Sequence, residues 1–189
     1  MVGLVKPSTS ERSPRERPVE ISGKPPLQRR PDDLAGYLEA LSRPVLEAGI
    51  SRRVISAKWH GIRGAFAGFE PTLVAEFGQD DVERLLGDAR VVRNRAKLEA
   101  IIDNAQAVLE LDAEHHGFAR YLQSHGGFEK TVTDLKRQFR FIGDSGAYHF
   151  LYVVDEPVPT YQEWFGTPAR KLPRRRATAA PRHASRPTA

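Results

Sequence analysis

The sequence predicts an all-α protein, in which one compact multi-helix domain is flanked by basic tails. Between residues 34 and 154, apolar residues recur at the three- and four-residue spacing of amphipathic helices. Gly and Pro interrupt that spacing at intervals, and the alternation typical of half-buried strands is scarce. A length of 189 residues suits one domain with tails. We therefore assign residues 32–167 to the helical domain and residues 1–31 and 168–189 to the tails.

The positive charge of the chain lies in its tails. Residues 1–31 hold seven basic and three acidic residues, and residues 168–189 hold seven basic residues and no acidic one. Because the whole chain carries +5, residues 32–167 are net −6. Both tails are rich in Pro, Ser and Arg and poor in apolar residues, which predicts disorder. Such tails either raise non-specific, salt-dependent affinity for DNA or serve only to solubilise the protein.

Composition excludes several classes of protein. The chain has no cysteine, and therefore no disulfide, thiolate metal ligand or thiol nucleophile. No apolar run approaches the ~18 residues that span a bilayer. Residues 1–18 lack the apolar stretch of a secretory signal. We expect a cytoplasmic protein that does not bind membranes.

Three helices are predicted in the first part of the domain. The first has an apolar face made of Leu34, Tyr37, Leu38, Leu41, Val45 and Leu46. Pro44 lies inside this pattern and is expected to kink or split the helix. The second face consists of Val54, Ile55, Trp59, Ile62 and Phe66. Pro71 suits the first turn of a short third helix, which carries Leu73, Val74 and Phe77.

The most informative stretch follows, from Asp80 to Ala105, and predicts a short helix, a tight basic turn and a longer helix. Asp80 is the expected cap of the short helix, with Glu83 completing a capping box, and Asn94 is the expected cap of the long one. The cations of the turn and of the following helix start are Arg90, Arg93, Arg95 and Lys97. Turn amides, a helix N-terminus and arginines all suit phosphate, which points to DNA binding. The same pattern also fits a solvated turn with ordinary surface charge.

Three further helices complete the domain. A short one carries Phe118, Tyr121 and Leu122, and the next carries Val132, Leu135 and Phe139. Asp144 is the expected cap of a last, strongly apolar helix. Pro157 and Pro159 follow this helix and end it.

Three segments of the domain resemble one protein family. They are YLEALSRPVLEAGIS from residue 37, AFAGFEPTLVAEFGQDDVERLLGDARVVRNRAKLEAIIDNAQAVL from residue 65, and DLKRQFRFIGDSGAYHFLY from residue 134. Together they resemble the DNA-3-methyladenine glycosylase I family over roughly residues 34–165. The resemblance implies an all-α protein with a helix-hairpin-helix DNA-binding unit that removes alkylated bases from DNA. It also implies that Arg90, Arg93, Asn94, Arg95 and Lys97 bind the DNA backbone.

The resemblance also implies a wedge and a pocket. Gly49 and Ile50 match the pair that the family inserts into the duplex, since glycine permits close approach and isoleucine is an apolar wedge. The alternative is a glycine that ends a helix, followed by a core contact. Tyr148 matches a tyrosine near the family's cavity, and its alternative is a buried tyrosine with a satisfied hydroxyl.

Two positions depart from the family pattern. Pro44 stands where the family has a base-reading glutamate, and Arg52 stands where it has a stacking tryptophan. A guanidinium stacks on a base but repels a cationic one. Glu47 is the candidate to replace the missing carboxylate as catalytic residue, with a surface carboxylate as the alternative. Trp59 is either a replacement aromatic or a core residue.

These residues predict a DNA N-glycosylase that excises alkylated purines such as 3-methyladenine in base excision repair, by base flipping and hydrolysis of the glycosidic bond. The base pocket would include Arg52 and Tyr148, and the expected partner is double-stranded DNA with alkylated bases. A cationic purine is already a good leaving group, so shape and electrostatics can suffice for catalysis. We expect no zinc or other cofactor, a monomer, and a location at the nucleoid.

Two alternatives remain open. The departures at Pro44 and Arg52 also fit a non-catalytic helix-hairpin-helix DNA-binding module that has lost base excision. A helical interaction protein whose basic tails bind an acidic partner is the third possibility. Deletion of both tails would abolish binding in that last case, whereas either DNA hypothesis predicts only a loss of affinity.

Overall fold

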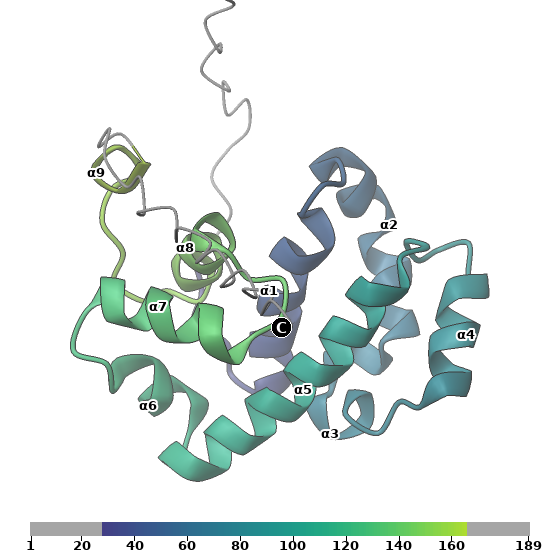
Figure 1. Cartoon of the computed structure of the whole chain (residues 1–189), viewed down its shortest axis with the longest axis horizontal. Coiled ribbons are helices and arrows are strands. Elements are labelled where there is room, and N and C mark those ends of the chain that lie inside the picture. The colour runs from purple at the N-terminus through teal and green to yellow at the C-terminus, as the bar shows by residue number, and fades with distance from the viewer. Residues whose placement is uncertain (1–27, 166–189) are drawn as a thin grey trace, which may run out of the picture.

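The computed structural model describes residues 28–165, and this part is built from α-helices and one 3-10 turn, without strands (Figure 1). The elements in chain order are α1 (Leu34–Glu47), α2 (Arg52–Ala65), η1 (Ala67–Phe69), α3 (Pro71–Val74), α4 (Gln79–Gly87), α5 (Arg95–His115), α6 (Phe118–Gln123), α7 (Phe128–Gln138), α8 (Asp144–Val153) and α9 (Tyr161–Phe165). The all-α prediction is confirmed.

The predicted disorder of the tails falls almost wholly outside the described residues. Arg29 and Arg30, which we had assigned to the first tail, contact Val153 and Glu156 of the domain.

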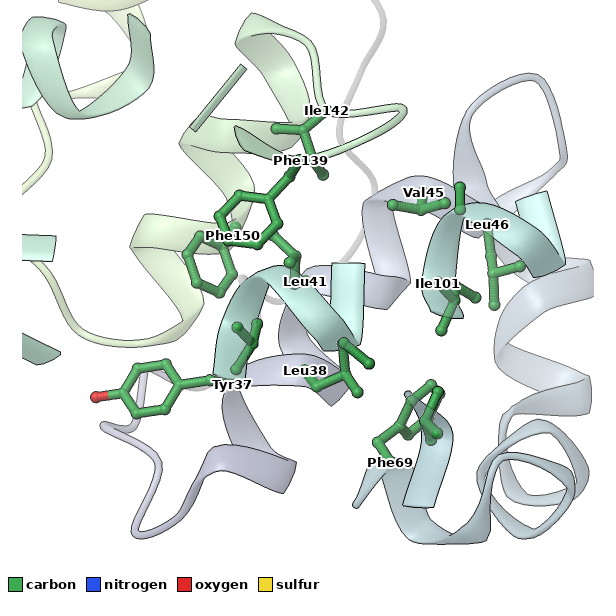
Figure 2. Close-up of a cluster of buried hydrophobic side chains, with 14 of the residues drawn as sticks. Tyr37, Leu38, Leu41, Val45, Leu46, Phe69, Ile101, Phe139, Ile142 and Phe150 are labelled. Carbon is green, nitrogen blue, oxygen red and sulfur yellow. The ribbon is translucent and has the colours of Figure 1, made fainter. Parts of the chain in front are cut away.

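The long helix α5, of 21 residues, crosses the middle of the molecule in Figure 1. On one side of it lie α2, α3 and α4, and on the other lie α6, α7, α8 and α9 (Figure 1). Helix α1 packs against both α5 and α8. Its apolar side chains therefore join the two sides in one core cluster, in which Figure 2 shows Leu41, Leu46, Ile101 and Phe150. Burial of this apolar surface is the main force that holds the helices together.

Helix α1 continues through Pro44 to Glu47, so the predicted split at this proline does not occur. Pro44 is buried and lies close to Gly146 of α8, where an added Cβ would approach the Pro44 Cβ to 3.3 Å. The close approach of two helices at a small residue explains why the proline is accommodated: tertiary packing replaces the hydrogen bond that proline cannot donate.

Two predicted helix caps are wrong by one or two residues. The N-cap of α4 is Gly78, whose N–H donates to Asp81 at 3.1 Å, so Asp80 lies inside the first turn. The N-cap of α8 is likewise a glycine, and Asp144 is the first helical residue, paired with Lys136 at 2.7 Å. An acidic residue in the first turn still favours the helix through its dipole. The cap of α5 is as predicted, because the Asn94 side chain accepts from the Lys97 N–H.

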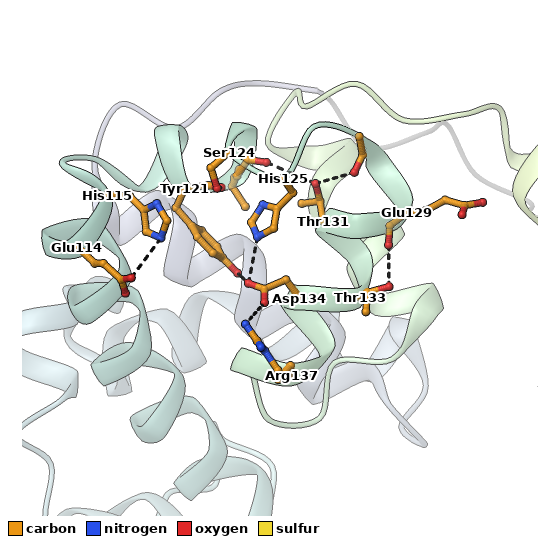
Figure 3. Close-up of polar contacts among 12 residues, drawn as sticks. Glu114, His115, Tyr121, Ser124, His125, Glu129, Thr131, Thr133, Asp134 and Arg137 are labelled. Atoms are coloured by element: carbon orange, nitrogen blue, oxygen red, sulfur yellow. Dashed lines mark hydrogen bonds and ion pairs between the residues drawn. The ribbon is translucent and has the colours of Figure 1, made fainter. Parts of the chain in front are cut away.

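A polar cluster joins α6 to α7 on the side of α5 away from α4 (Figures 1 and 3). The Asp134 carboxylate accepts from the Tyr121 hydroxyl at 2.9 Å, lies 3.1 Å from His125 Nε2 and pairs with Arg137 at 2.5 Å. Burial alone would raise the pKa of Asp134, but these three partners lower it. Burial and the bond to Asp134 raise the pKa of Tyr121. The cluster therefore links two helices by polar contacts, although the buried Nδ1 of His125 has no hydrogen-bond partner among the described residues.

Candidate nucleic-acid interface and base pocket

The turn between α4 and α5, residues 88–94, is the hairpin of this protein. Val91 and Val92 are buried and anchor it to the core, whereas Arg90, Arg93 and Asn94 are exposed. The first turn of α5 follows directly, so its N–H groups and positive dipole lie beside the exposed arginines. This combination of amides and cations is suited to a phosphate backbone.

Helix α2 supports the hairpin from one side. The Arg90 stem lies so close to Gly61 that a Cβ added there would approach the Arg90 Cβ to 2.7 Å. Lys58, one turn earlier, donates to the Ala89 carbonyl oxygen. The glycine in α2 thus permits the hairpin to pack closely on the helix, while the lysine satisfies one of its carbonyl groups.

The arginines in and directly after the hairpin are partly neutralised by nearby carboxylates. Arg90 pairs with Asp88 at 2.8 Å, and the hydrogen bonds from Arg90 lower the pKa of Asp88 to about 2. Arg95 pairs with Glu83 and also lies 3.6 Å from Glu99. Arg93 has no carboxylate partner within the described part of the chain. The sequence showed four cations without an acid among them, but the fold places Glu83 of α4 and Glu99 of α5 against Arg95, and Asp88 of the hairpin against Arg90.

Lys97 differs from the expectation for a phosphate-binding residue. Only 4% of it is exposed, and its Nζ donates to the Leu46 carbonyl at 2.9 Å and to the Ala48 carbonyl. These are carbonyls at the C-terminal end of α1, which have no partner within the helix. Burial lowers the pKa of Lys97. The side chain joins the start of α5 to the end of α1 and is not available to a DNA phosphate.

The loop that joins α1 to α2 follows these carbonyls. Gly49 is exposed with φ +74°, and a Cβ added there would meet nothing within 4 Å, so its backbone conformation is what favours glycine. Ile50 is half-buried and packs against the core cluster. This geometry fits the alternative of a helix-ending glycine and a core contact. Gly49 also remains exposed, and Lys97 in the first turn of α5 holds the carbonyl of the preceding residue, Ala48.

A cavity of about 480 Å³ opens between the start of α2 and the segments α8 and α9. We call it the base pocket, after the pocket in which the sequence places Arg52 and Tyr148. Its lining residues are Gln28, Arg52, Ser145, Tyr148, His149, Tyr152, Val158, Pro159, Thr160, Tyr161 and Phe165. The fold thus brings together Arg52 and Tyr148, which lie far apart in the sequence. The volume falls in the range of small-molecule sites.

Glu47 lies behind one wall of the base pocket and does not line it. Its carboxylate is only 10% exposed and is shared by two guanidiniums, Arg43 at 3.1 Å and Arg52 at 3.2 Å. The alternative of a surface carboxylate is therefore wrong. Arg43 is itself held by Ser56 at 2.7 Å. Glu47 fixes the position of Arg52, whose guanidinium is 66% exposed and lines the pocket.

Tyr148 and His149 form the opposite wall of the base pocket from α8. The Tyr148 hydroxyl donates to the Pro159 carbonyl at 3.0 Å, and its ring lies 5.3 Å from that of Phe165. Burial lowers the pKa of His149, the Glu47 carboxylate opposes this, and the guanidiniums of Arg52 and Arg43 reinforce it. The imidazole is therefore uncharged near neutral pH.

Sequence reasoning missed His149 as a pocket residue. The histidine directly follows Tyr148 in the last, strongly apolar helix. The signal that was present in the sequence is its helical spacing from Ser145 and Tyr152, which lie one turn away on either side and also line the pocket.

Two residues considered for the base pocket lie elsewhere. Trp59 stacks on Phe69 at 5.6 Å and donates to Glu39 at 2.9 Å, so it belongs to the contact between α1 and α2. Pro44 packs under α8 and is absent from the pocket lining. Neither therefore replaces the aromatic or the carboxylate of the family pattern.

The residues present do not fit a structural zinc site. The chain contains no cysteine, and no group of three or more His, Asp or Glu residues within residues 28–165 could hold a metal ion. In the same part of the chain, no helix is long and apolar enough to cross a membrane.

The all-helical fold and the hairpin between α4 and α5 define a helix-hairpin-helix domain of the DNA glycosylase type. The chain belongs to the methyladenine glycosylase family, because the family model matches residues 29–140, which is more than half of the chain. The base-pocket residues of α8 and α9 lie beyond the matched segment.

Relatives and solved structures agree with this assignment. The chain is 30% identical over 126 residues to DNA-3-methyladenine glycosylase 1 of Escherichia coli K12, covering 56% of this chain and 67% of that protein. It is 28% identical over 126 residues to DNA-3-methyladenine glycosylase of Haemophilus influenzae, covering 56% and 68%. The structure of 3-methyladenine DNA glycosylase I from Staphylococcus aureus, described in terms of 3-methyladenine recognition, superposes with a TM-score of 0.60 at 26% identity and covers 67% of this chain and 78% of that one.

Proposed function

We propose that this protein is a DNA N-glycosylase that excises an alkylated purine from double-stranded DNA in base excision repair. The observation that carries the proposal is that Arg52 of the base pocket begins the helix after the loop of Gly49, while Lys97 joins that loop to the first turn of α5, directly after the hairpin. A glycosylase needs a backbone-binding element and a pocket for the flipped base within reach of each other. Membership of the methyladenine glycosylase family supports the same activity.

In this proposal the hairpin holds the DNA backbone. Arg90, Arg93 and Arg95 contact phosphates, with Asn94 capping the helix whose N–H groups face the same backbone. Lys97 is buried and contacts no phosphate. It stabilises the loop of Gly49 by donating to the Ala48 carbonyl. Gly49 and Ile50 fill the space left in the duplex, which requires Ile50 to move from its partly buried position.

The flipped purine enters the base pocket and lies between Arg52 and the aromatic wall that includes Tyr148. Glu47, our candidate catalytic carboxylate, acts as a positioning residue because it holds Arg52 and does not line the pocket. Water forms the new bond to C1′ of the sugar as the bond from C1′ to the purine nitrogen breaks. The electron pair of that bond leaves with the base. A cationic alkylpurine is thereby released as the neutral base, and the proton lost by water passes to the solvent.

Base release tests the proposal. Purified protein is incubated with alkylated duplex DNA, the free bases are identified by chromatography, and DNA binding is titrated in parallel. We expect an alkylpurine in the released fraction and a protein that acts as a monomer on DNA. Tight binding without any released base, over a panel of alkylated purines, would instead identify a non-catalytic DNA-binding module.

A further inference from the structure

The inner wall of the base pocket carries few polar side chains. Most of the polar residues that line the pocket are exposed, among them Arg52, Ser145, Thr160 and Tyr161. The inner wall consists of the lining residues that are only partly exposed, which are Tyr148, His149, Tyr152, Val158 and Pro159. Its polar side chains are therefore two tyrosines and one histidine, all from α8.

His149 provides the strongest free acceptor of this inner wall. Among the described residues, neither nitrogen of its ring has a hydrogen-bond partner. The Tyr148 hydroxyl, by contrast, already donates to the Pro159 carbonyl. An uncharged imidazole has one N–H donor and one basic nitrogen, which accepts better than a phenol oxygen because its lone pair is not delocalised into the ring.

Helix α1, which packs against α8 at this place, contributes no competing acceptor. Pro44 of α1 lies against Gly146, one turn before His149, and its side chain has no polar atom. Glu47 lies one turn further along α1, and its carboxylate is already shared by two guanidiniums. A donor group of a ligand at the inner wall therefore meets the imidazole nitrogen and not a carboxylate.

The electrostatic surroundings of the inner wall are compatible with a cationic base. The charged side chains that act on Tyr148 and His149 are two carboxylates and two guanidiniums, those of Glu47, Glu163, Arg43 and Arg52. The Glu163 carboxylate also accepts from the Thr160 hydroxyl of the lining at 2.8 Å. Burial lowers the pKa of His149, so the imidazole adds no positive charge near neutral pH. The four charges balance, and the faces of the tyrosine rings attract a cation.

We propose, on the basis of the glycosylase function proposed above, that His149 recognises the flipped base by accepting a hydrogen bond from the exocyclic amino group of a cationic alkyladenine. Alkylation at N3 of adenine leaves this amino group in place and makes the ring cationic, which strengthens its N–H donors. Unmodified adenine is uncharged and forms the weaker, neutral hydrogen bond. His149 is thus a specificity-determining residue that favours the alkylated base.

Substitutions of His149 in the full-length protein test this role. His149→Leu removes the acceptor, so kcat/KM for release of 3-methyladenine from methylated duplex DNA should fall about 10- to 100-fold, the size of one hydrogen bond to a charged group. His149→Gln keeps an acceptor in its amide oxygen and should retain most of the activity. His60→Leu is the matched control and should match the wild type, since His60 is exposed on α2 and does not line the pocket.

The pH profile distinguishes a contact with the base from a structural role. Protonation removes the acceptor of His149 and places a cation beside a cationic base, so activity should fall as the pH decreases through the pKa of this residue. Because burial lowers that pKa, the fall should lie below the usual range of histidine. Glutamine does not titrate, so His149→Gln should lack this acid limb. An acid limb that persists unchanged in His149→Gln overturns the proposal.

Binding of free 3-methyladenine separates this proposal from the glycosylase function itself. The imidazole nitrogen signals of the protein are followed by NMR during a titration with the free base, and His149→Leu identifies the signal of His149. A shift of that signal without base release supports the recognition role and contradicts the glycosylase function. Release at the wild-type rate by His149→Leu overturns the proposal while the glycosylase function stands. Neither a shift nor release contradicts both.

Discussion

The hairpin and the base pocket both pair arginines with carboxylates, but the pairs differ in burial. Beside the hairpin, Glu83 of α4 is 57% exposed where it pairs with Arg95 of α5, whereas Glu47 at the pocket is 10% exposed between its two guanidiniums. Exposed ion pairs contribute about 0–1 kcal/mol, so a DNA phosphate can replace the carboxylate of the hairpin at little cost. A buried carboxylate that holds two cations cannot be exchanged in this way. The hairpin is therefore suited to binding DNA reversibly, and the pocket to holding one fixed geometry.

The largest effect is expected at Glu47. Glu47→Gln keeps the size of the side chain but removes the charge that positions Arg52. Misplacement of a substrate-contacting group by about 1 Å is enough to slow an enzyme about 100-fold. We expect kcat for base release to fall by about this factor, while KM for DNA stays nearly unchanged, because Glu47 does not belong to the hairpin. Single-turnover and steady-state kinetics measure the two quantities.

Glu83→Gln is the matched control for this comparison. It removes the same charge from an exposed pair with Arg95 and should leave kcat near that of the wild type. Melting temperatures of both variants establish that they are folded. An equal effect of the two substitutions on kcat would show that the buried carboxylate has no particular role in positioning.

A smaller effect, on stability, is expected from substitution of Lys97, which joins the start of α5 to the end of α1. Lys97→Met keeps the apolar stem but leaves the Leu46 and Ala48 carbonyls without their donor. Unsatisfied buried acceptors cost about 1–3 kcal/mol, so the free energy of unfolding should fall by about 2 kcal/mol. Urea unfolding measures this loss.

Lys58 provides the comparison for Lys97, because it also donates to a carbonyl, that of Ala89, but at a more exposed place. Water can replace its ammonium, so Lys58→Met should change the free energy of unfolding by no more than about 0.5 kcal/mol. If the two substitutions destabilised the protein equally, burial would not be what makes the Lys97 contact matter.

The two regions also differ in how far the sequence predicts them. The hairpin is contiguous, so the Asn94 cap and the apolar faces of the two helices are visible as local patterns. The burial of Lys97 depends on carbonyls about 50 residues earlier in the chain, which no local pattern reveals. Arg52 and Tyr148 were found only through the family resemblance. His149 and the sharing of Glu47 emerge when α1, α2 and α8 pack together.

The helix caps show that local sequence patterns are also inexact over a few residues. Asp80 and Asp144 are good capping residues, and each lies within the first turn of the helix that it was expected to cap. Glycine precedes each turn and provides the N-cap instead. A local propensity thus predicts that a helix begins nearby, while the surrounding packing determines the residue at which it begins.

The smallest effect is expected from Arg93 of the hairpin and Arg95, the first residue of α5. Arg93→Ala together with Arg95→Ala removes two proposed phosphate contacts, so the slope of log affinity against log salt should fall by about two and affinity by about tenfold at low salt. The control is Arg120→Ala with Lys130→Ala, which removes two exposed cations from α6 and α7, on the other side of α5 (Figure 1). Its salt slope should remain that of the wild type. A hairpin variant with an unaltered slope would show that DNA binds another face, because loss of a phosphate contact must change the number of counterions released.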